Sequence, residues 1–403
     1  MRRPAVTRSR DECARVRFGD VVENINDQPQ RSTLPSETRY IAGEHVDEDR
    51  LTIARWGTLG DDLVPPTFRR RFQSGDVLFH SRNLRKIAVP EFGGITGEKL
   101  FVLRSHSPSL LQEFIPFLLL SPGFTACVQA SWSGSVNKFL NWTPLERFEF
   151  DLPSIRDQLS IVEGLSALHA VIEAYRCATH RAMQTRDSLI MHLYQFGTGS
   201  EERVVTPLGV LPKSWTVEPL DSRYDVQLGK KLSPAAAAKG DRRPYLRNEN
   251  IDWNTLDLSD IKEMGFTADE RSKVELRPGD IVACEGRHVG KSAIWRGEVP
   301  GMCCQNTLHR LRARTEEDSS EYMLHCLRYF HITGRFVVDT AASTIPHLTL
   351  DRFRPMLFPF PPAVEQHAIS GRIRRFDDIT ANLTQRLRNA VGMLQHVSAS
   401  CFS

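Results

Sequence analysis

The sequence predicts a mixed α/β protein with two duplicated globular units, each followed by a long amphipathic helix. Three observations predict this architecture. Sequence blocks recur in the same order in both halves, the blocks lie among short apolar runs broken by turn residues, and each half ends in an extended helical periodicity. Because the repeated blocks keep their order and a nearly constant spacing, an internal duplication explains them better than chance similarity.

Four pairs of blocks carry the duplication. Within each globular unit, runs such as GDVLF and GDIVA are bounded by Gly, Pro, Asn and Asp, which is typical of strands and turns. The paired blocks are YIAGEHVD and YLRNENID (40–47, 245–252), FQSGDVLF and LRPGDIVA (72–79, 276–283), EFIPFLL and EYMLHCL (113–119, 321–327), and LPSIRDQLSI and FPPAVEQHAI (152–161, 360–369).

The end of each half is predicted to be one helix of about 40 residues, or on the order of 60 Å. Apolar residues recur there at spacings of three and four and form a narrow seam, which predicts that the two helices pack on each other as an antiparallel coiled coil in a pseudo-twofold molecule. The seam residues are Ile155, Leu159, Val162, Leu165, Leu168, Ile172 and Tyr175 in one helix, and Ile369, Ile373, Phe376, Ile379, Leu383, Leu387, Ala390 and Leu394 in the other.

These patterns divide the chain into six segments. The glycines in YQFGTGS end the first helix, and a linker then leads to the second globular unit. The predicted segments are a disordered N-terminal arm at 1–14, a globular unit at 15–153, a helix at 154–197, a linker at 198–212, a second globular unit at 213–361 and a second helix at 362–403.

Composition places the chain among folded cytoplasmic proteins. It has 403 residues, 40% of them apolar and 25% charged, and a net charge of +3, which is too small to identify a nucleic-acid binder. The eight cysteines form no CxxC pair and are expected to be reduced thiols. No apolar segment follows the basic start, and the most apolar run, 114–120, is too short to span a bilayer.

One segment raises the alternative of a nucleotide hydrolase. In GDIVACEGRHVGKSAI (279–294), two glycines are followed by Lys291 and Ser292, as in a phosphate-binding loop. Such a loop needs four residues between its glycines to wrap the phosphates with backbone N–H groups, and here there are three. The first copy, GDVLFHSRNLRKIAV, places Arg82 and Lys86 where the second has Gly286 and Gly290, so the two copies share basic side chains rather than a glycine cradle.

Two further alternatives are a metal-dependent nuclease and a protein-interaction scaffold. A nuclease could use Asp252, Asp260 and Lys262, but the first copy has no counterpart of the Asp-x-Lys pattern. The histidines lack ligand spacing, and the motifs of amino-methyltransferases are absent from the sequence. A scaffold would use the helices for protein partners and bind no DNA. The sequence predicts no catalytic residue, no cofactor-binding residue and no metal site.

In its motifs the chain resembles the specificity (S) subunit of type I restriction–modification systems. The resemblance covers about residues 15–400, although the first half opens with CARVRFGDV (13–21) instead of an LPxxW motif. The motifs that carry it are LPKSW (211–215), YLRNENID (245–252), LRPGDIV (276–282), FPFPPAVEQHAI (358–369) and DLPSIRDQLSI (151–161).

The resemblance implies a non-catalytic subunit of a restriction–modification complex. Two target-recognition domains would each read one half-site of a bipartite double-stranded DNA target, with the helices as the spacer. The implied partners are two methyltransferase (modification) subunits and a restriction/translocase subunit. S-adenosylmethionine, ATP and Mg²⁺ are expected on those partner subunits and not on this chain.

Two loops in each globular unit are candidates for contact with DNA, because Lys and Arg bind phosphates and Arg, Lys, Asn and His read base edges. Three further basic residues are candidates for backbone contact: Lys230, Lys231 and Arg247. The candidates in the loop after the GD motif are Arg82, Asn83, Arg85 and Lys86 in the first copy, and Arg287, His288 and Lys291 in the second. Those in the later loop are Asn137 and Lys138 in the first copy, and Thr344 and His347 in the second.

Overall fold

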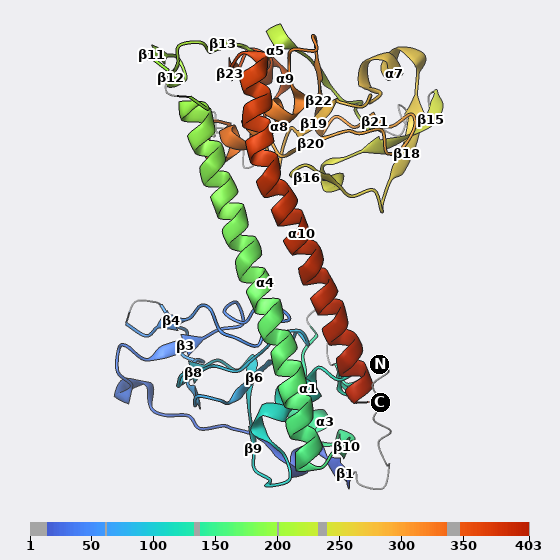
Figure 1. Cartoon of the computed structure of the whole chain (residues 1–403). Helices are drawn as coiled ribbons and strands as arrows, with labels where there is room; N and C mark the ends of the chain where they lie inside the picture. The colour runs from blue at the N-terminus through green and yellow to red at the C-terminus, as the bar shows by residue number, and fades with distance from the viewer. Residues whose placement is uncertain are drawn as a thin grey trace, which may run out of the picture. The chain divides into compact units, whose positions relative to one another are not determined.

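The computed structural model (Figure 1) describes residues 14–60, 63–132, 138–199, 201–232, 240–336 and 347–402. The chain divides into two compact units, which we call the first unit (1–177 and 384–403) and the second unit (178–383). Each long helix therefore contributes residues to both units. The arm predicted over 1–14 lies outside the described residues, except for Ala14.

The first unit contains two four-stranded sheets and one further strand pair. One sheet has the antiparallel order β2-β9-β6-β7, and the other has the order β4-β3-β8-β5, in which β3 and β8 are parallel. Strands β1 and β10 pair antiparallel. The strands are β1 (Ala14–Arg17), β2 (Val22–Asn24), β3 (Arg39–Ile41), β4 (Gly57–Thr58), β5 (Arg70–Phe72), β6 (Val77–His80), β7 (Ile87–Ala88), β8 (Gly94–Thr96), β9 (Leu100–Ser105) and β10 (Glu149–Leu152).

The second unit repeats this topology, which confirms the duplication. The sheet β14-β22-β19-β20 corresponds to β2-β9-β6-β7, the parallel pair β15 and β21 corresponds to β3 and β8, and β13-β23 corresponds to β1-β10. The strands are β13 (Thr216–Pro219), β14 (Tyr224–Leu228), β15 (Asp241–Leu246), β16 (Ile251–Asp252), β17 (Thr255–Leu256), β18 (Lys262–Phe266), β19 (Ile281–Cys284), β20 (Ser292–Ile294), β21 (Cys303–Cys304), β22 (Leu308–Ala313) and β23 (Leu357–Phe360).

Short helices cover the apolar faces of these sheets. In the first unit, Phe117 and Phe124 join a core with strand residues such as Phe79. In the second, Tyr322 and Phe330 do the same with Ile281. The helices are α1 (Ile115–Leu119), α2 (Pro122–Ala130), α3 (Trp142–Glu146), α5 (Leu220–Arg223), α7 (Ala268–Val274), α8 (Ser320–Ile332) and α9 (Leu350–Phe353).

The two long helices are α4 (Ile155–Phe196) and α10 (Ala363–Cys401). In the second unit, Arg186 donates a hydrogen bond to Asp377 (2.9 Å), and the backbone N–H of Thr198, just beyond α4, donates to Glu365 (2.9 Å). Because the later residue of one helix meets the earlier residue of the other, the helices run antiparallel in this unit. The predicted fold class is confirmed in its duplicated mixed globules and long antiparallel helices; the pseudo-twofold relation stays a prediction.

The predicted seam is only partly buried. Some of its residues pack on the globule of their own unit instead of on the other helix. Leu165 belongs to the core of the first unit, and Ile369 belongs to that of the second. By contrast, Leu159 is 55% exposed and Ile379 is 48% exposed. Helix-on-helix packing therefore accounts for a smaller share of the seam than the periodicity predicts.

A buried glutamine fastens the start of each long helix to its globule. Gln158, in the block LPSIRDQLSI, accepts a hydrogen bond from the backbone of Leu111 (2.9 Å) and donates to the carbonyl oxygen of Pro153 (2.9 Å). Gln366, in FPPAVEQHAI, accepts from the backbone of Ser319 (3.0 Å) and donates to Pro361 (3.0 Å). The repeated glutamine therefore has a structural role, since it satisfies backbone groups that burial removes from water.

The segment predicted as a linker, 198–212, contains a short hairpin. Strands β11 (Arg203–Thr206) and β12 (Gly209–Pro212) pair antiparallel, and Gly209, the residue that follows the turn, has φ +108°. A positive φ is readily accessible to glycine, so the turn explains this residue.

No single helix in the described part of the chain is long and apolar enough to cross a membrane. One bent pair, 112–119 with 122–130, passes the same test of length and composition, with an angle of 63° between its parts.

Candidate nucleic-acid interface

In both units a GD motif leads into the hairpin that carries the first candidate loop. Asp76 accepts a hydrogen bond from the backbone of Gln73 (2.7 Å) and pairs with Arg104 (2.8 Å). Asp280 makes the same kind of pair with Arg312 in the second unit. Both carboxylates are buried. The aspartate of the motif therefore holds the turn and the neighbouring strand, and it does not face a ligand.

The strands of the two hairpins correspond residue by residue, but the loop of the second hairpin is one residue longer. The backbone of His80 bonds to that of Lys86 (3.0 Å), and the backbone of Cys284 bonds to that of Lys291 (2.8 Å). This register makes Lys291 the counterpart of Lys86. The expected match of Gly290 with Lys86 is therefore wrong by one residue, because the second loop holds one extra residue.

The hairpin geometry excludes the phosphate-loop hypothesis. The segment leads into strand β20, whereas a phosphate-binding loop leads into a helix whose N-terminus faces the phosphates. Gly290 has φ +80°, and a Cβ there would lie 2.2 Å from the ring of Phe336. The glycine is thus required by a close packing contact, and the Lys291 ammonium pairs with the carboxylate of Asp252 (2.8 Å).

In the first unit, the hairpin loop is held by carboxylates from the segment after β3. Asn83 donates to Glu48 (2.9 Å), and the guanidinium of Arg85 pairs with both Glu48 (3.0 Å) and Asp49. Arg82, by contrast, is exposed and makes no ion pair with any residue that the structure describes. Of the four candidates in this loop, Arg82 is thus the cation with the greatest freedom to meet a phosphate or a base.

The fourth candidate, Lys86, and its counterpart Lys291 both fasten the hairpin to the preceding segment. Lys86 donates to the backbone oxygen of Gly43 (2.6 Å), and Lys291 pairs with Asp252. These segments are the repeated blocks YIAGEHVD and YLRNENID. Sequence reasoning found the blocks but did not identify Glu48 and Asp49, just beyond the first block, as partners of the candidate cations.

The second unit exposes two candidates at the tip of its hairpin loop. Arg287 and His288 are exposed, and Arg287 has no partner among the described residues. Its backbone lies in the left-handed region, with φ +59°. A non-glycine residue there costs about 1–3 kcal/mol unless the surroundings compensate. Arg287 therefore combines a strained backbone with an unpaired guanidinium at the tip of the loop.

The two candidate loops of each unit meet through equivalent backbone hydrogen bonds. The backbone of Leu140 donates to Ser81 (2.8 Å), and that of Leu348 donates to Glu285 (2.7 Å). In the second unit, His347 also lies opposite Gly286 in a β-bridge. The sequence predicted the loops separately, and the structure places them together at the same position in both copies.

Only one of the remaining candidates in the later loops lies within the described residues. The ammonium of Lys138 lies 5.3 Å from the ring centroid of Trp132, in an exposed cation–π contact. Asn137 and Thr344 lie outside the described residues.

Of the three predicted backbone contacts, Lys230 has to be corrected. Its side chain is buried, and its ammonium donates to the carbonyl oxygen of Gly265 (2.8 Å) and to Glu270 (2.7 Å). A buried lysine with both partners serves the fold and is not presented to a DNA phosphate. Arg247 pairs with Asp260 (2.7 Å) and is largely covered, whereas Lys231 is exposed.

The nuclease hypothesis also lacks a site in the structure. Asp252 pairs with Lys291 and Asp260 pairs with Arg247, so different cations neutralise the two carboxylates. Within the described ranges, no group of three or more His, Cys, Asp or Glu side chains could hold a metal ion.

The later loop of the second unit depends on a neutral histidine, which predicts a loss of stability in acid. Burial lowers the pKa of His309 from its usual 6.5 to about 4, and its Nε2 bonds to the carbonyl oxygen of Leu348 (2.7 Å). Its Nδ1 has no hydrogen-bond partner among the described residues. The unfolded chain takes up a proton near pH 6.5, so this contribution is complete above that pH and is lost as the pH falls towards 4.

Between pH 7 and pH 4.5 the expected loss is about 2 kcal/mol in the free energy of unfolding, because the last part of the effect is expressed only below pH 4.5. Chemical denaturation at pH 7 and pH 4.5 measures it, and His309→Gln is the matched variant, because glutamine keeps a donor for Leu348 but does not titrate in this range. An equal pH dependence in both proteins would contradict the assignment to His309.

Comparison with known proteins finds similarity to one family. Residues 212–392 match the family described as type I restriction modification DNA specificity domain. Over 355 residues, the chain is 20% identical to the putative type I restriction enzyme MjaX specificity subunit of Methanocaldococcus jannaschii. The alignment covers 83% of this chain and 79% of that protein. The second half of the chain thus matches a type I restriction–modification DNA specificity domain, and the chain as a whole is similar to a specificity subunit.

Two solved structures share the fold. A chain from a study of the complex assembly and conformational transition of a type I restriction–modification system has a TM-score of 0.57 at 18% identity, over 97% of both chains. The type I S subunit from M. genitalium has a TM-score of 0.56 at 13% identity, over 97% of this chain and 96% of that one. At these identities the likeness concerns the fold.

Proposed function

We propose that this chain recognises the DNA target of a type I restriction–modification complex, with one half-site read by each unit. The observation that supports the proposal is the repeated pair of loops. In each unit a hairpin loop and a later loop meet through the same backbone bond, and each pair carries exposed basic residues. Because Arg82 and Arg287 come from loops of different sequence, the two half-sites are expected to differ.

We further propose that this chain has no catalytic activity and binds no cofactor. Two methyltransferase subunits and a restriction/translocase subunit would join it in the cytoplasm and supply the sites for S-adenosylmethionine, ATP and Mg²⁺. The pairing of Lys291 with Asp252 supports this view, because the lysine that would serve a nucleotide is already engaged.

Selection of bound duplexes from a random pool tests the function. The full chain is used with its methyltransferase partner, and we expect enrichment of a bipartite motif whose two half-sites are separated by a fixed unread gap. Absence of enrichment would refute DNA recognition and favour a scaffold. Measurement of ATP hydrolysis by the chain separates both from a nucleotide hydrolase.

The helices are expected to set the gap between the half-sites. Inserting about four residues after Tyr175 in α4, with a matching insertion in α10, adds roughly one helical turn, or about 6 Å. The same selection should then return unchanged half-sites with a longer gap. Substituting Tyr175 without an insertion is the control. An unchanged gap would mean that the helices do not determine the spacing.

A further inference from the structure

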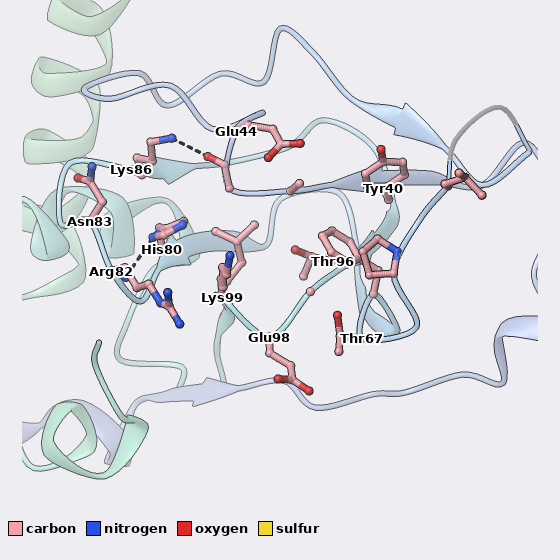
Figure 2. A pocket seen from close by; sticks show the side chains of 17 residues that line it. Tyr40, Glu44, Thr67, His80, Arg82, Asn83, Lys86, Thr96, Glu98 and Lys99 are labelled. Carbon is pink, nitrogen blue, oxygen red and sulfur yellow. Dashed lines mark hydrogen bonds between the residues drawn. The ribbon is translucent and has the colours of Figure 1, made fainter. Parts of the chain in front are cut away.

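A pocket of about 940 Å³ lies in the first unit beside the hairpin loop (Figure 2). Its walls come from β3, from the segments 42–44 and 63–68, from the end of β6 and from β8 with the turn that follows it. A pocket of this size accommodates a small organic ligand. Arg82, Asn83 and Lys86 belong both to this pocket and to the candidate interface, whereas residues such as Tyr40 and Lys99 were not among the DNA-contact candidates.

One end of the pocket is basic. Figure 2 shows Arg82, His80 and Asn83 gathered at this end, with Lys86 nearby and Lys99 extending into the space between the two ends. Arg82 and Lys99 are exposed and form no ion pair with the residues that the structure describes. Cations that share one pocket repel each other, so an anion placed among them would relieve the repulsion.

The histidine at this end is a hydrogen-bond donor at neutral pH. Burial, together with the charges of Lys86, Lys99 and Arg82, lowers the pKa of His80 to about 4, so its ring is neutral. Its Nδ1 accepts from the backbone of Arg82 (3.0 Å), which leaves the proton on Nε2. Nε2 lies where a Cβ on Gly43 would be 2.6 Å away, so the glycine makes room for the ring.

The other end of the pocket is aromatic. Tyr40 and Phe68 meet edge to face, with ring centroids 5.5 Å apart, and Thr67 lies at the same end (Figure 2). Aromatic side chains are the usual stacking partners of nucleobases. Glu44 and Glu98 also line the pocket, and a carboxylate accepts hydrogen bonds from the exocyclic amino group of a base.

The second unit replaces several residues of the basic end. By the strand register, Asn248 occupies the place of Gly43, Cys284 that of His80 and Thr307 that of Lys99. The Asn248 amide donates to the backbone of Gly286 (3.2 Å), so a side chain fills this region and bonds to the hairpin. The basic end thus belongs to the first unit and is not a requirement of the shared fold.

We propose that this pocket binds a nucleotide, with the phosphate at the basic end and an amino-bearing base at the aromatic end. The nucleotide has two candidate sources. It is either a free nucleotide or a nucleotide of the bound DNA that has left the base stack, and the second source rests on the proposed DNA recognition.

The free source is tested with the full chain and dAMP, using inorganic phosphate as the reference probe. We expect dAMP to bind at least tenfold more tightly than phosphate in calorimetric titration. Lys99→Thr, which introduces the residue of the second unit, should weaken dAMP binding about tenfold. The matched control is Lys262→Thr, which removes an exposed lysine from β18 and should leave dAMP binding unchanged.

The DNA source is tested with duplexes that carry 2-aminopurine at successive positions of the first half-site, with the methyltransferase partner present. A rise in fluorescence at one position reports unstacking, and Lys99→Thr should abolish that rise while the duplex stays bound. Matching duplexes labelled in the second half-site should show no Lys99-dependent rise.

The two arms also separate failure of the pocket from failure of DNA recognition. Selective DNA binding with neither dAMP binding nor a Lys99-dependent fluorescence rise would overturn the proposal that the pocket binds a nucleotide. The proposed function would remain intact. Equal affinity for dAMP and phosphate, without a fluorescence rise, would also overturn it. If the chain does not select DNA at all, the proposed function fails and the dAMP titration alone decides the pocket.

Discussion

Replacing Arg287 by alanine is expected to reduce discrimination at one base pair of the second half-site about tenfold to hundredfold. The side chain is exposed at the tip of the hairpin loop, has no partner among the described residues and lies beside the later loop that carries His347. An arginine that reads a base contributes about 1–3 kcal/mol of discrimination, which corresponds to this range. Competition binding with duplexes that differ at single positions measures the change.

A glycine variant separates this effect from instability. Because Arg287 has φ +59°, Arg287→Gly relieves backbone strain that Arg287→Ala retains, so the glycine variant should be more stable by about 1 kcal/mol. Both variants should lose the same discrimination. Arg85→Ala is the matched control. It should leave discrimination in the second half-site unchanged, since Arg85 lies in the first unit and is held by Glu48 and Asp49. Uniformly weaker binding to every duplex, with a smaller salt dependence, would assign Arg287 to a phosphate instead.

Replacing Asp280 by alanine is expected to lower the free energy of unfolding of the second unit by about 3 kcal/mol. The carboxylate is 1% exposed, bonds to Arg312 and accepts from the backbone of Arg277 (2.8 Å). Removing it leaves a partly buried guanidinium without its counter-ion and a turn without its acceptor, and breaking a buried ion pair costs about 3–5 kcal/mol. The exposed part of Arg312 favours the lower end of this range.

Hydrogen exchange of the full chain locates this effect. Protection should fall in β19 and β22 and stay unchanged in β6 and β9, because the first unit keeps its own pair between Asp76 and Arg104. Asp76→Ala should give the reverse pattern. Asp241→Ala, which removes a largely exposed carboxylate near Arg243 and Arg271, should cost less than about 1 kcal/mol. Loss of protection in both units after Asp280→Ala would show that they unfold as one.

Much of the fold was predictable because the chain contains the same information twice. Blocks such as FQSGDVLF and LRPGDIVA locate equivalent strands and turns, and the apolar spacing locates α4 and α10. The positions of the hairpin loops, and hence the exposure of Arg82 and Arg287, follow from the same comparison. The extra residue in the second loop could not be predicted, because a gap in a short, dissimilar loop is fixed only by the hydrogen-bond register of its strands.

Pairing of the candidate cations depends on residues that are distant in the sequence. Lys230 is neutralised by Glu270, and Arg85 by Glu48 and Asp49, so neither arrangement is visible in a local charge cluster. A lysine beside a strand has the same local pattern whether its ammonium is buried against a carboxylate or exposed to solvent. The tertiary neighbours decide between these outcomes, which is why Lys230 was wrongly predicted to be a phosphate contact.

The backbone bond from Leu140 to Ser81, and its equivalent from Leu348 to Glu285, has a consequence for protein engineering. Because each hairpin loop is tied to one later loop, neither can be transplanted alone without losing its support. The two loops of a unit form a cassette that should be exchanged together between homologues. The hairpin tolerates a difference in length, as the two copies show, provided that the backbone of Lys86 or Lys291 still closes it.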